Sequence, residues 1–349
     1  MQLIRPLKIG SVTLKNNLIL APLAGYSDIA FRRLCRELGA GLTITEMVSV
    51  RGLLYESSKT RDLMTLADCE SPSSLQLFGS NHNDFKEAAN RGLIDGFDLI
   101  DINMGCPMPK ITKNGDGSAL LDNVENATKI VEALVACGKT VTVKVRLGKK
   151  DKANAINFCK AIEHAGASLI TVHGRTAKQL YSGTADWEAI GEVANALKIP
   201  VVGNGDILTQ QDILDKLATY PVAGVMIGRG AIARPNIFSQ CTMHNAQCTM
   251  NDKLLNEEQG IAVGNKDNNC ALCIVHCALK NVHCALKEII LKHIDYTLEN
   301  FNENFTVHKL RKHFAYYFRG VPNIKDLKMF LMRCDSVVEM RRAIEGAQF

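Results

Sequence analysis

One cysteine of this sequence stands where a thiol could do chemistry. Cys106 lies in NMGCPMPK, a polar loop that directly follows an apolar run. Cysteines inside helices are usually buried and inert, and we expect this of Cys35, Cys137 and Cys159. A thiol in a short loop fixed by proline is different, because its ordinary pKa of about 8.5 lets it give up a proton near neutral pH. We therefore predict that Cys106 is an acid or a nucleophile.

Lys144 is a charged residue within a run of valines, VKVRLG. Such a lysine usually points to solvent, and otherwise it serves a site inside the fold. Two functions would suit it there, namely a Schiff base, as in aldolases, or a positive charge beside a bound anionic ring. The aldolase alternative leaves Cys106 without a task.

Two glycine-rich turns follow the last two apolar runs, GNGD at Gly203–Asp206 and IGRGA at Ile227–Ala231. Glycines let a ligand approach the backbone closely, and Arg229 can donate two hydrogen bonds to one phosphate. The phosphate site of (β/α)₈ barrels commonly lies after strands seven and eight. Either turn alone would be an ordinary turn, but together they predict a phosphorylated cofactor.

The elements that must position these residues are apolar runs separated by amphipathic segments such as 123–137 and 153–165. Eight runs in this alternation favour an α/β fold of the (β/α)₈ TIM-barrel type, with the candidate residues gathered at one rim. An open doubly wound sheet would need a G-x-G-x-x-G loop after the first run, where this chain has APLAG. The runs are Leu18–Ala21, Leu42–Thr45, Ser74–Phe78, Phe97–Ile102, Thr140–Val145, Ser168–Val172, Pro200–Gly203 and Ala223–Ile227.

The chain has 349 residues, more than the roughly 250 that one barrel takes. The alternation stops after Phe238, so we predict a catalytic barrel over 1–240 and a small all-helical domain over 241–349. The stretch 241–286 is rich in cysteine, and four of its cysteines fall on one helical stripe. Such a stripe is typical of a core-facing surface, with a metal site as the alternative, and we expect no metal.

Composition places the chain among ordinary globular proteins, with 46% hydrophobic and 22% charged residues. Neither an export signal nor a long apolar run stands out, so we expect a cytoplasmic monomer with reduced thiols and no membrane association.

The net charge of +5 is concentrated in the last part of the sequence. From Phe305 onward nine Lys or Arg face four Asp or Glu, while the rest is balanced. Helical spacing puts Lys309, Lys312 and Arg319 near one face, with aromatic residues packed inward. A basic tail on a balanced body predicts either a nucleic-acid-binding surface or a merely solvated helix face.

Several motifs in order resemble the tRNA-dihydrouridine synthase family, in its bacterial B-like branch. They are NMGCPMPKITKNGDGSALL, VKVRLG, HGRTAKQLYSGTADW, GNGD and IGRGAIARP, and the resemblance spans 7–238 and resumes at 311–320. It implies a barrel that binds FMN, NADPH or NADH as electron donor, and a helical domain that binds tRNA. The implied reaction reduces the 5,6 double bond of uracil in tRNA.

The resemblance also implies roles for individual residues. Cys106 would be the proton donor, and His173 would lie near the cofactor phosphate. The charge count of the tail and the segment RKHFAYYFRG at 311–320 favour Lys312 and Arg319 as contacts to tRNA. Asn103, Arg146 and Arg175 would contact uracil or a nearby phosphate. The residues that would hold FMN are Pro22, Leu23, Ala24, Gln76, Lys144, Asn204, Gly205, Asp206, Gly228 and Arg229.

Two other functions stay open on the sequence alone. A flavin barrel acting on a free pyrimidine, as in dihydroorotate dehydrogenases, has no use for the basic tail. A tRNA-binding protein with secondary chemistry has no use for Cys106.

Overall fold

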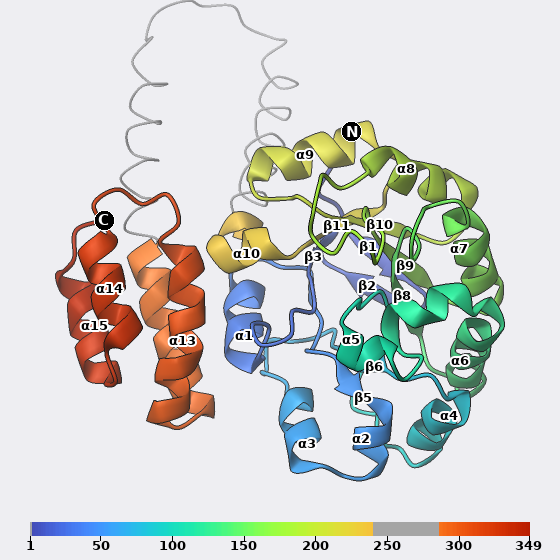
Figure 1. Ribbon diagram of the computed structural model, residues 1–349, viewed down its shortest axis with the longest axis horizontal. Coiled ribbons are helices and arrows are strands. Elements are labelled where there is room, and N and C mark those ends of the chain that lie inside the picture. The colour runs from blue at the N-terminus through green and yellow to red at the C-terminus, as the bar shows by residue number, and fades with distance from the viewer. Residues whose placement is uncertain (1, 240–285) are drawn as a thin grey trace, which may run out of the picture.

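A computed structural model describes residues 2–239 and 286–349. Figure 1 shows a barrel ringed by helices and, beside it, a lobe of C-terminal helices that lies next to α1 and α10. The fold is the predicted TIM barrel followed by helices. The predicted boundary at 240 falls where the described residues stop, and it stays a prediction. The cysteine-rich stretch 241–286 lies outside the described residues except for its last residue.

The barrel is one parallel sheet whose strands follow in the order β4-β3-β11-β10-β9-β8-β7-β6-β5. All eight predicted runs contain a strand, shifted by a residue or two at most of the ends. The strands are β3 (Leu18–Leu20), β4 (Leu42–Thr43), β5 (Val48–Ser49), β6 (Ser74–Phe78), β7 (Leu99–Met104), β8 (Val141–Arg146), β9 (Leu169–His173), β10 (Val201–Asn204) and β11 (Gly224–Ile227).

The strands β4 and β5 are two halves of one interrupted barrel strand, and they close the sheet. β4 pairs with β3, and β5 pairs with β6. Between them the Thr45 N–H donates to the Ser74 carbonyl at 3.1 Å, and the Thr45 hydroxyl accepts the Gln76 N–H at 3.0 Å. The Thr45 hydroxyl thus takes the place of one backbone carbonyl in the ladder. The second run continues past its predicted end at Thr45 to β5.

The alternation of side chains along each strand separates the core from the site, because successive residues point to opposite faces. In β8 the valines at 141, 143 and 145 belong to the core beneath the outer helices. Their neighbours Thr142, Lys144 and Arg146 are therefore on the barrel's inner face. The other strands repeat this division, so the polar residues of the runs share the interior of one barrel.

An antiparallel hairpin that the sequence analysis missed lies at the amino-terminal end of the barrel. It consists of β1 (Leu7–Ile9) and β2 (Val12–Leu14). Its apolar side chains pack with inward residues from the first half of the strands, among them Ile19, Leu99 and Leu169. Because this half of the interior is filled with apolar side chains, any cavity must open at the other end.

Most of the outer helices begin at an N-cap side chain and follow the strands as predicted. The two predicted amphipathic segments 123–137 and 153–165 form α6 and α7. The helices of the barrel are α1 (Ile29–Glu37), α2 (Val50–Leu54), α3 (Ser58–Met64), α4 (His82–Asn90), α5 (Pro109–Thr112), the 3₁₀ helix η1 (Gly117–Asp122), α6 (Val124–Ala136), α7 (Ala155–His164), α8 (Trp187–Ala196), α9 (Gln210–Thr219) and α10 (Arg229–Ala233).

The C-terminal lobe is helical throughout its described part. Residues 286–300 form a helix, followed by α13 (Glu303–Tyr317), α14 (Lys325–Arg333) and α15 (Val337–Gly346). The lobe has an apolar cluster of its own, which includes Ile294, Leu310 and Phe314. Within 2–239 and 286–349, each helix is too short or too polar to cross a bilayer.

Candidate active site

Side chains from the carboxyl ends of the strands line a cavity of about 600 Å³. The predicted cofactor residues all line it, namely Pro22, Leu23, Ala24, Gln76, Lys144, His173, Asn204, Gly205, Asp206, Gly228 and Arg229. Cys106, Asn103 and Arg146 line it as well. A volume of this size is typical of sites for small molecules and cofactors. The sequence therefore located the cavity, while the individual roles stay predictions.

The loop that carries Cys106 is held in place by hydrogen bonds from three directions. The Asn103 side-chain oxygen accepts the N–H groups of Gly105 at 3.1 Å and Cys106 at 2.9 Å. The Cys106 carbonyl accepts the Ser118 N–H at 3.0 Å, and the Gly105 carbonyl accepts Arg146 Nε–H at 2.9 Å. The thiol of Cys106 is partly exposed on the cavity wall. These bonds hold the backbone from which the thiol enters the cavity.

A chain of buried polar groups stands behind this loop. The Asn103 amide donates to Gln76 Oε1 at 2.9 Å, and Gln76 Nε2 donates to Asp101 at 2.7 Å. The Thr142 hydroxyl donates to the other oxygen of Asp101 at 2.6 Å. Burial raises the pKa of Asp101, while these hydrogen bonds and the Lys144 charge oppose the rise. Asn103 thus positions the Cys106 loop, a task that its prediction as a uracil contact did not foresee.

Three cations, Lys144, Arg146 and Arg229, line the cavity near His173, and Arg175 lies behind them. Burial, followed by the charges of Lys144, Arg146, Arg175 and Arg229, lowers the pKa of His173 to about 2, so this ring is neutral. Burial and Arg146 lower the pKa of Lys144 to about 8, and its ammonium donates to Asn204 Oδ1 at 3.3 Å. A surplus of positive charge in a half-enclosed site favours an anionic ligand.

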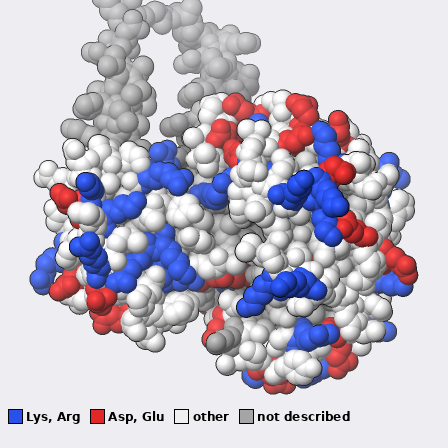
Figure 2. Space-filling view, in the orientation of Figure 1, with Lys and Arg blue, Asp and Glu red and all other residues white. Residues whose placement is uncertain are grey.

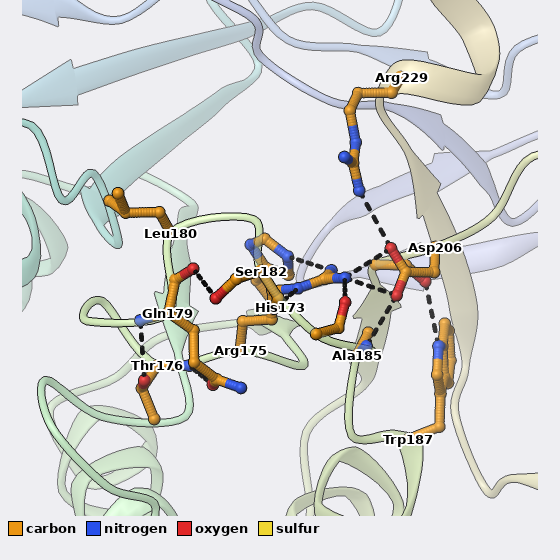
Figure 3. A network of polar contacts seen from close by, with 12 residues as sticks. His173, Arg175, Thr176, Gln179, Leu180, Ser182, Ala185, Trp187, Asp206 and Arg229 are labelled. Carbon is orange, nitrogen blue, oxygen red and sulfur yellow. Dashed lines mark hydrogen bonds and ion pairs between the residues drawn. The ribbon is translucent and has the colours of Figure 1, made fainter.

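Arg175 does not line the cavity, which corrects its prediction as a direct substrate contact. Its side chain is 2% exposed and bonds both oxygens of Asp206, at 2.9 and 2.7 Å. It also donates to the carbonyls of Ser182 at 3.1 Å and Gly183 at 2.7 Å (Figure 3). Arg175 therefore ties the loop after β9 to the turn after β10, and it acts as a positioning residue.

The turn after β10 is shaped by its glycine and by Asp206. Gly205 has a φ of +130° and Asp206 a φ of +49°. The Asp206 carboxylate accepts Arg229 at 3.0 Å and the Ala185 N–H at 2.7 Å, and the Trp187 indole donates to the Gly205 carbonyl at 3.0 Å (Figure 3). Arg229 is thereby held at the cavity, 41% exposed, with donors left for a ligand.

Several lining residues escaped the sequence analysis. Tyr26, Met47 and Tyr181 line the cavity from the barrel, and Tyr316 does so from α13. The Tyr26 and Tyr316 rings meet edge to face, with centroids 5.6 Å apart. Tyr26 stands two residues beyond the predicted Ala24, so its position was a usable signal. Tyr316 was expected to pack inward with the other aromatic residues of its helix, whose Phe314 and Tyr317 do so.

The basic residues of α13 and of the turn that follows it divide into two groups. Lys312 and Arg319 are exposed as predicted, and Arg319 stacks over the Tyr316 ring at 5.4 Å. Lys309 is buried instead and forms ion pairs with Asp28 and Glu46 of the barrel. The predicted shared face of Lys309, Lys312 and Arg319 is therefore wrong for Lys309, because the barrel covers it.

Among the helical cysteines, Cys35 and Cys159 are buried, and burial raises the pKa of both thiols, that of Cys159 to about 12. This supports the expectation that they are inert.

The Cys106 loop, the cationic cavity and the attached helices find their match in one protein family. The model of the family described as "Dihydrouridine synthase (Dus)" matches residues 19–348. The chain belongs to the dihydrouridine synthase family. It is therefore an oxidoreductase enzyme, and the resemblance seen in the motifs is confirmed.

Relatives within the family are similar in sequence over two thirds of the chain or more. A probable tRNA-dihydrouridine synthase from Rickettsia bellii is 35% identical over 325 residues, covering 92% of this chain and 91% of the relative. The tRNA-dihydrouridine synthase B from Pseudomonas putida is 41% identical over 235 residues, covering 67% of this chain and 70% of its own.

Solved structures share the barrel at low sequence identity. A 2-naphthoyl-CoA reductase is similar with a TM-score of 0.56 at 13% identity, covering 70% of this chain and 52% of its own. Histamine dehydrogenase from Rhizobium sp. 4-9 is similar with a TM-score of 0.54 at 18% identity, covering 70% of this chain and 48% of its own. These likenesses support the fold.

Proposed function

We propose that this enzyme is a cytoplasmic tRNA-dihydrouridine synthase that reduces uridines in tRNA with FMN and NADPH or NADH. The observation that carries the proposal is the cavity itself. It joins a fixed thiol, a cationic wall and an edge formed by a helix of the C-terminal lobe.

The residues present fit FMN. Four cations near His173 suit a phosphate, and among the described residues that line the cavity Asp206 is the one with a carboxylate. Arg229, Gly205 and Gly228 at the ends of β10 and β11 would hold that phosphate, where barrels commonly bind one. The amides of Gln76 and Asn204 and the Lys144 ammonium would hold the ring, with the 22–24 loop beside it. When bound, FMN supplies the hydride that adds to carbon 6 of uracil.

The part left to the chain is to place the base and protonate it. Hydride addition at carbon 6 leaves negative charge between carbon 5 and the carbon 4 carbonyl, so an acid must deliver a proton to carbon 5. The Cys106 thiol lies on the cavity wall and would be this acid. Arg146 Nη2 makes no hydrogen bond within the described residues and is free for a carbonyl of the base or a phosphate.

The surface around the cavity suits a polyanion. Figure 2 shows Lys and Arg gathered on the C-terminal lobe and bordering the hollow between the two lobes. A uridine must leave its stack to enter the cavity, which costs a few kcal/mol that backbone contacts must offset. Lys312 on α13 and Arg319 in the turn after it are exposed and would supply such contacts.

The proposal is tested by purifying the protein and recording its absorbance spectrum. We expect a bound flavin that NADPH or NADH reduces without oxygen and that unmodified tRNA reoxidises. Free uracil or orotate reoxidising it in place of tRNA would favour the free-pyrimidine alternative. Purified protein that neither contains nor takes up a flavin would overturn the cofactor assignment.

Neutralising Lys312 and Arg319 should weaken tRNA binding and flatten its salt dependence. Each lost phosphate contact lowers the slope of log K against log salt by about one, because fewer counterions are released. Lys312→Gln and Arg319→Gln would be compared with Lys129→Gln, which removes an exposed lysine of α6 far along the chain. NADPH oxidation without tRNA should stay normal. An unchanged slope in the folded Lys312→Gln and Arg319→Gln variants would show that tRNA is bound elsewhere.

Gly117→Ala should slow the reaction by displacing the Cys106 loop. Gly117 has a φ of +60°, and a Cβ there would lie 2.7 Å from the Cys106 carbonyl oxygen. A misplacement of about 1 Å can cost about 100-fold in rate. Gly138→Ala is the matched control, since Gly138 has a φ of +75° with nothing within 4 Å of its Cβ position. Equal rates for the two variants, with flavin bound in both, would contradict this account.

A further inference from the structure

We propose that Lys309 is a positioning residue that couples the C-terminal lobe to the wall of the cavity. It does so through Glu46, which holds the loop 22–27. The expected effect of this coupling on cofactor binding rests on the proposed function. The expected effect on the 22–27 loop does not.

Lys309 reaches from α13 into the barrel and ends between two carboxylates. Its ammonium lies 2.8 Å from Asp28 Oδ2 and 3.6 Å from Glu46 Oε1. The three side chains are 9%, 6% and 11% exposed in that order. Within the described residues, these two carboxylates have no other ion-pair partner. Two buried carboxylates side by side need a cation, because removing one partner of a buried pair leaves uncompensated charge.

Each carboxylate uses its second oxygen to fix the barrel. Asp28 Oδ1 accepts the Phe31 N–H at 2.9 Å and caps α1. Glu46 Oε2 accepts the Gly25 N–H at 2.6 Å. Gly25 has a φ of +81° and is the turn of the loop whose Pro22, Leu23, Ala24 and Tyr26 line the cavity. Glu46 thus connects Lys309 to the cavity wall, because it pairs with Lys309 through one oxygen and accepts the Gly25 N–H with the other.

The same helix also completes the cavity directly. Tyr316 stands seven residues after Lys309, two helical turns along the same side, and contacts Tyr26 edge to face. His313 lies between them and contacts the Tyr26 ring, with centroids 5.4 Å apart. Docking of α13 and the shape of the 22–27 loop are therefore linked at two points, one ionic and one aromatic.

Another ion pair between the lobes offers a matched control. Arg33 of α1 pairs with Glu299 at 2.5 Å, on the exposed edge of the same interface. Neither residue lines the cavity or contacts the 22–27 loop in the described structure. Glu299→Gln removes a cross-lobe ion pair and leaves the loop alone.

The first measurement is amide hydrogen exchange in the cofactor-free protein. In Lys309→Met we expect faster exchange at residues 22–27 than in the wild type, because Glu46 without its cation no longer holds Gly25. In Glu299→Gln the same residues should exchange at the wild-type rate. Unchanged exchange at 22–27 in Lys309→Met, or the same increase in Glu299→Gln, would overturn the proposal. This outcome is independent of whether the protein binds FMN.

The second measurement is the dissociation constant for FMN in a double-mutant cycle. We expect Lys309→Met to raise it about tenfold, the scale of one charge-assisted hydrogen bond. In a Glu46→Gln background the same change should matter much less, since the amide can still accept from Gly25 and carries no charge to balance. Should Lys309→Met not fold, Lys309→Gln takes its place in both backgrounds of the cycle. An equal effect of Lys309→Met in both backgrounds would contradict coupling through Glu46.

Discussion

Replacing Cys106 by alanine is expected to slow dihydrouridine formation by about 10²- to 10⁴-fold, the usual contribution of a positioned acid. FMN and tRNA binding should stay near the wild-type values, because the loop is held through backbone groups that alanine keeps. Single-turnover reactions with pre-reduced enzyme measure this step directly. Without the thiol, carbon 5 of uracil must take its proton from solvent. The transfer of hydride to carbon 6 does not involve this side chain.

The matched control for this variant is Cys69→Ala. Cys69 is also an exposed thiol, but it lies outside the cavity. It should react at the wild-type rate. A wild-type rate for Cys106→Ala would remove the thiol from the mechanism, and an equal loss in both variants would point to general damage.

Replacing Lys144 by methionine should raise the dissociation constant for FMN by about 10- to 100-fold, the range for a lost charged hydrogen bond. The pKa of Lys144 is lowered to about 8 in the cavity, chiefly by burial. Its ammonium is therefore present at pH 7, and an anionic ligand binds this form better. Wild-type affinity should fall as the pH rises above about 8, and in Lys144→Met this fall should disappear.

Arg229→Ala removes a positive charge from the same cavity but leaves the titrating group, Lys144, in place. It should also weaken FMN, because Arg229 is the exposed cation at the predicted phosphate position. The fall in affinity above about pH 8 should persist in this variant, since Lys144 is still there. Full flavin occupancy in both variants at every pH would show that the cofactor assignments are wrong.

The barrel could be predicted because strand composition and alternation are local properties of the sequence. The missed hairpin β1–β2 has strands of only three residues each, too short for a period to show. The interruption between β4 and β5 depends on the Thr45 hydroxyl meeting Gln76, which lies 31 residues away. No local pattern encodes such a contact.

The site divides in the same way. Residues that directly follow strands were found, because the carboxyl ends of barrel strands meet at one rim. Arg175 does not line the cavity and Lys309 does not share the exposed face of Lys312, since both side chains are paired with carboxylates that folding brings near. Helical spacing placed Lys309 near the face of Lys312 but could not tell which part of that face the barrel covers. Tyr316 was missed because it belongs to the C-terminal lobe, whereas the other residues that line the cavity belong to the barrel.

We expect uridine in tRNA to be reduced at this cavity. The most direct test is to incubate unmodified tRNA with the purified enzyme, FMN and NADPH. The tRNA is then digested and its nucleosides are analysed by mass spectrometry. The account predicts that a uridine gains the mass of two hydrogen atoms, and that Cys106→Ala greatly slows the gain. Enzyme whose flavin is reduced by NADPH but that leaves every uridine unchanged would contradict it.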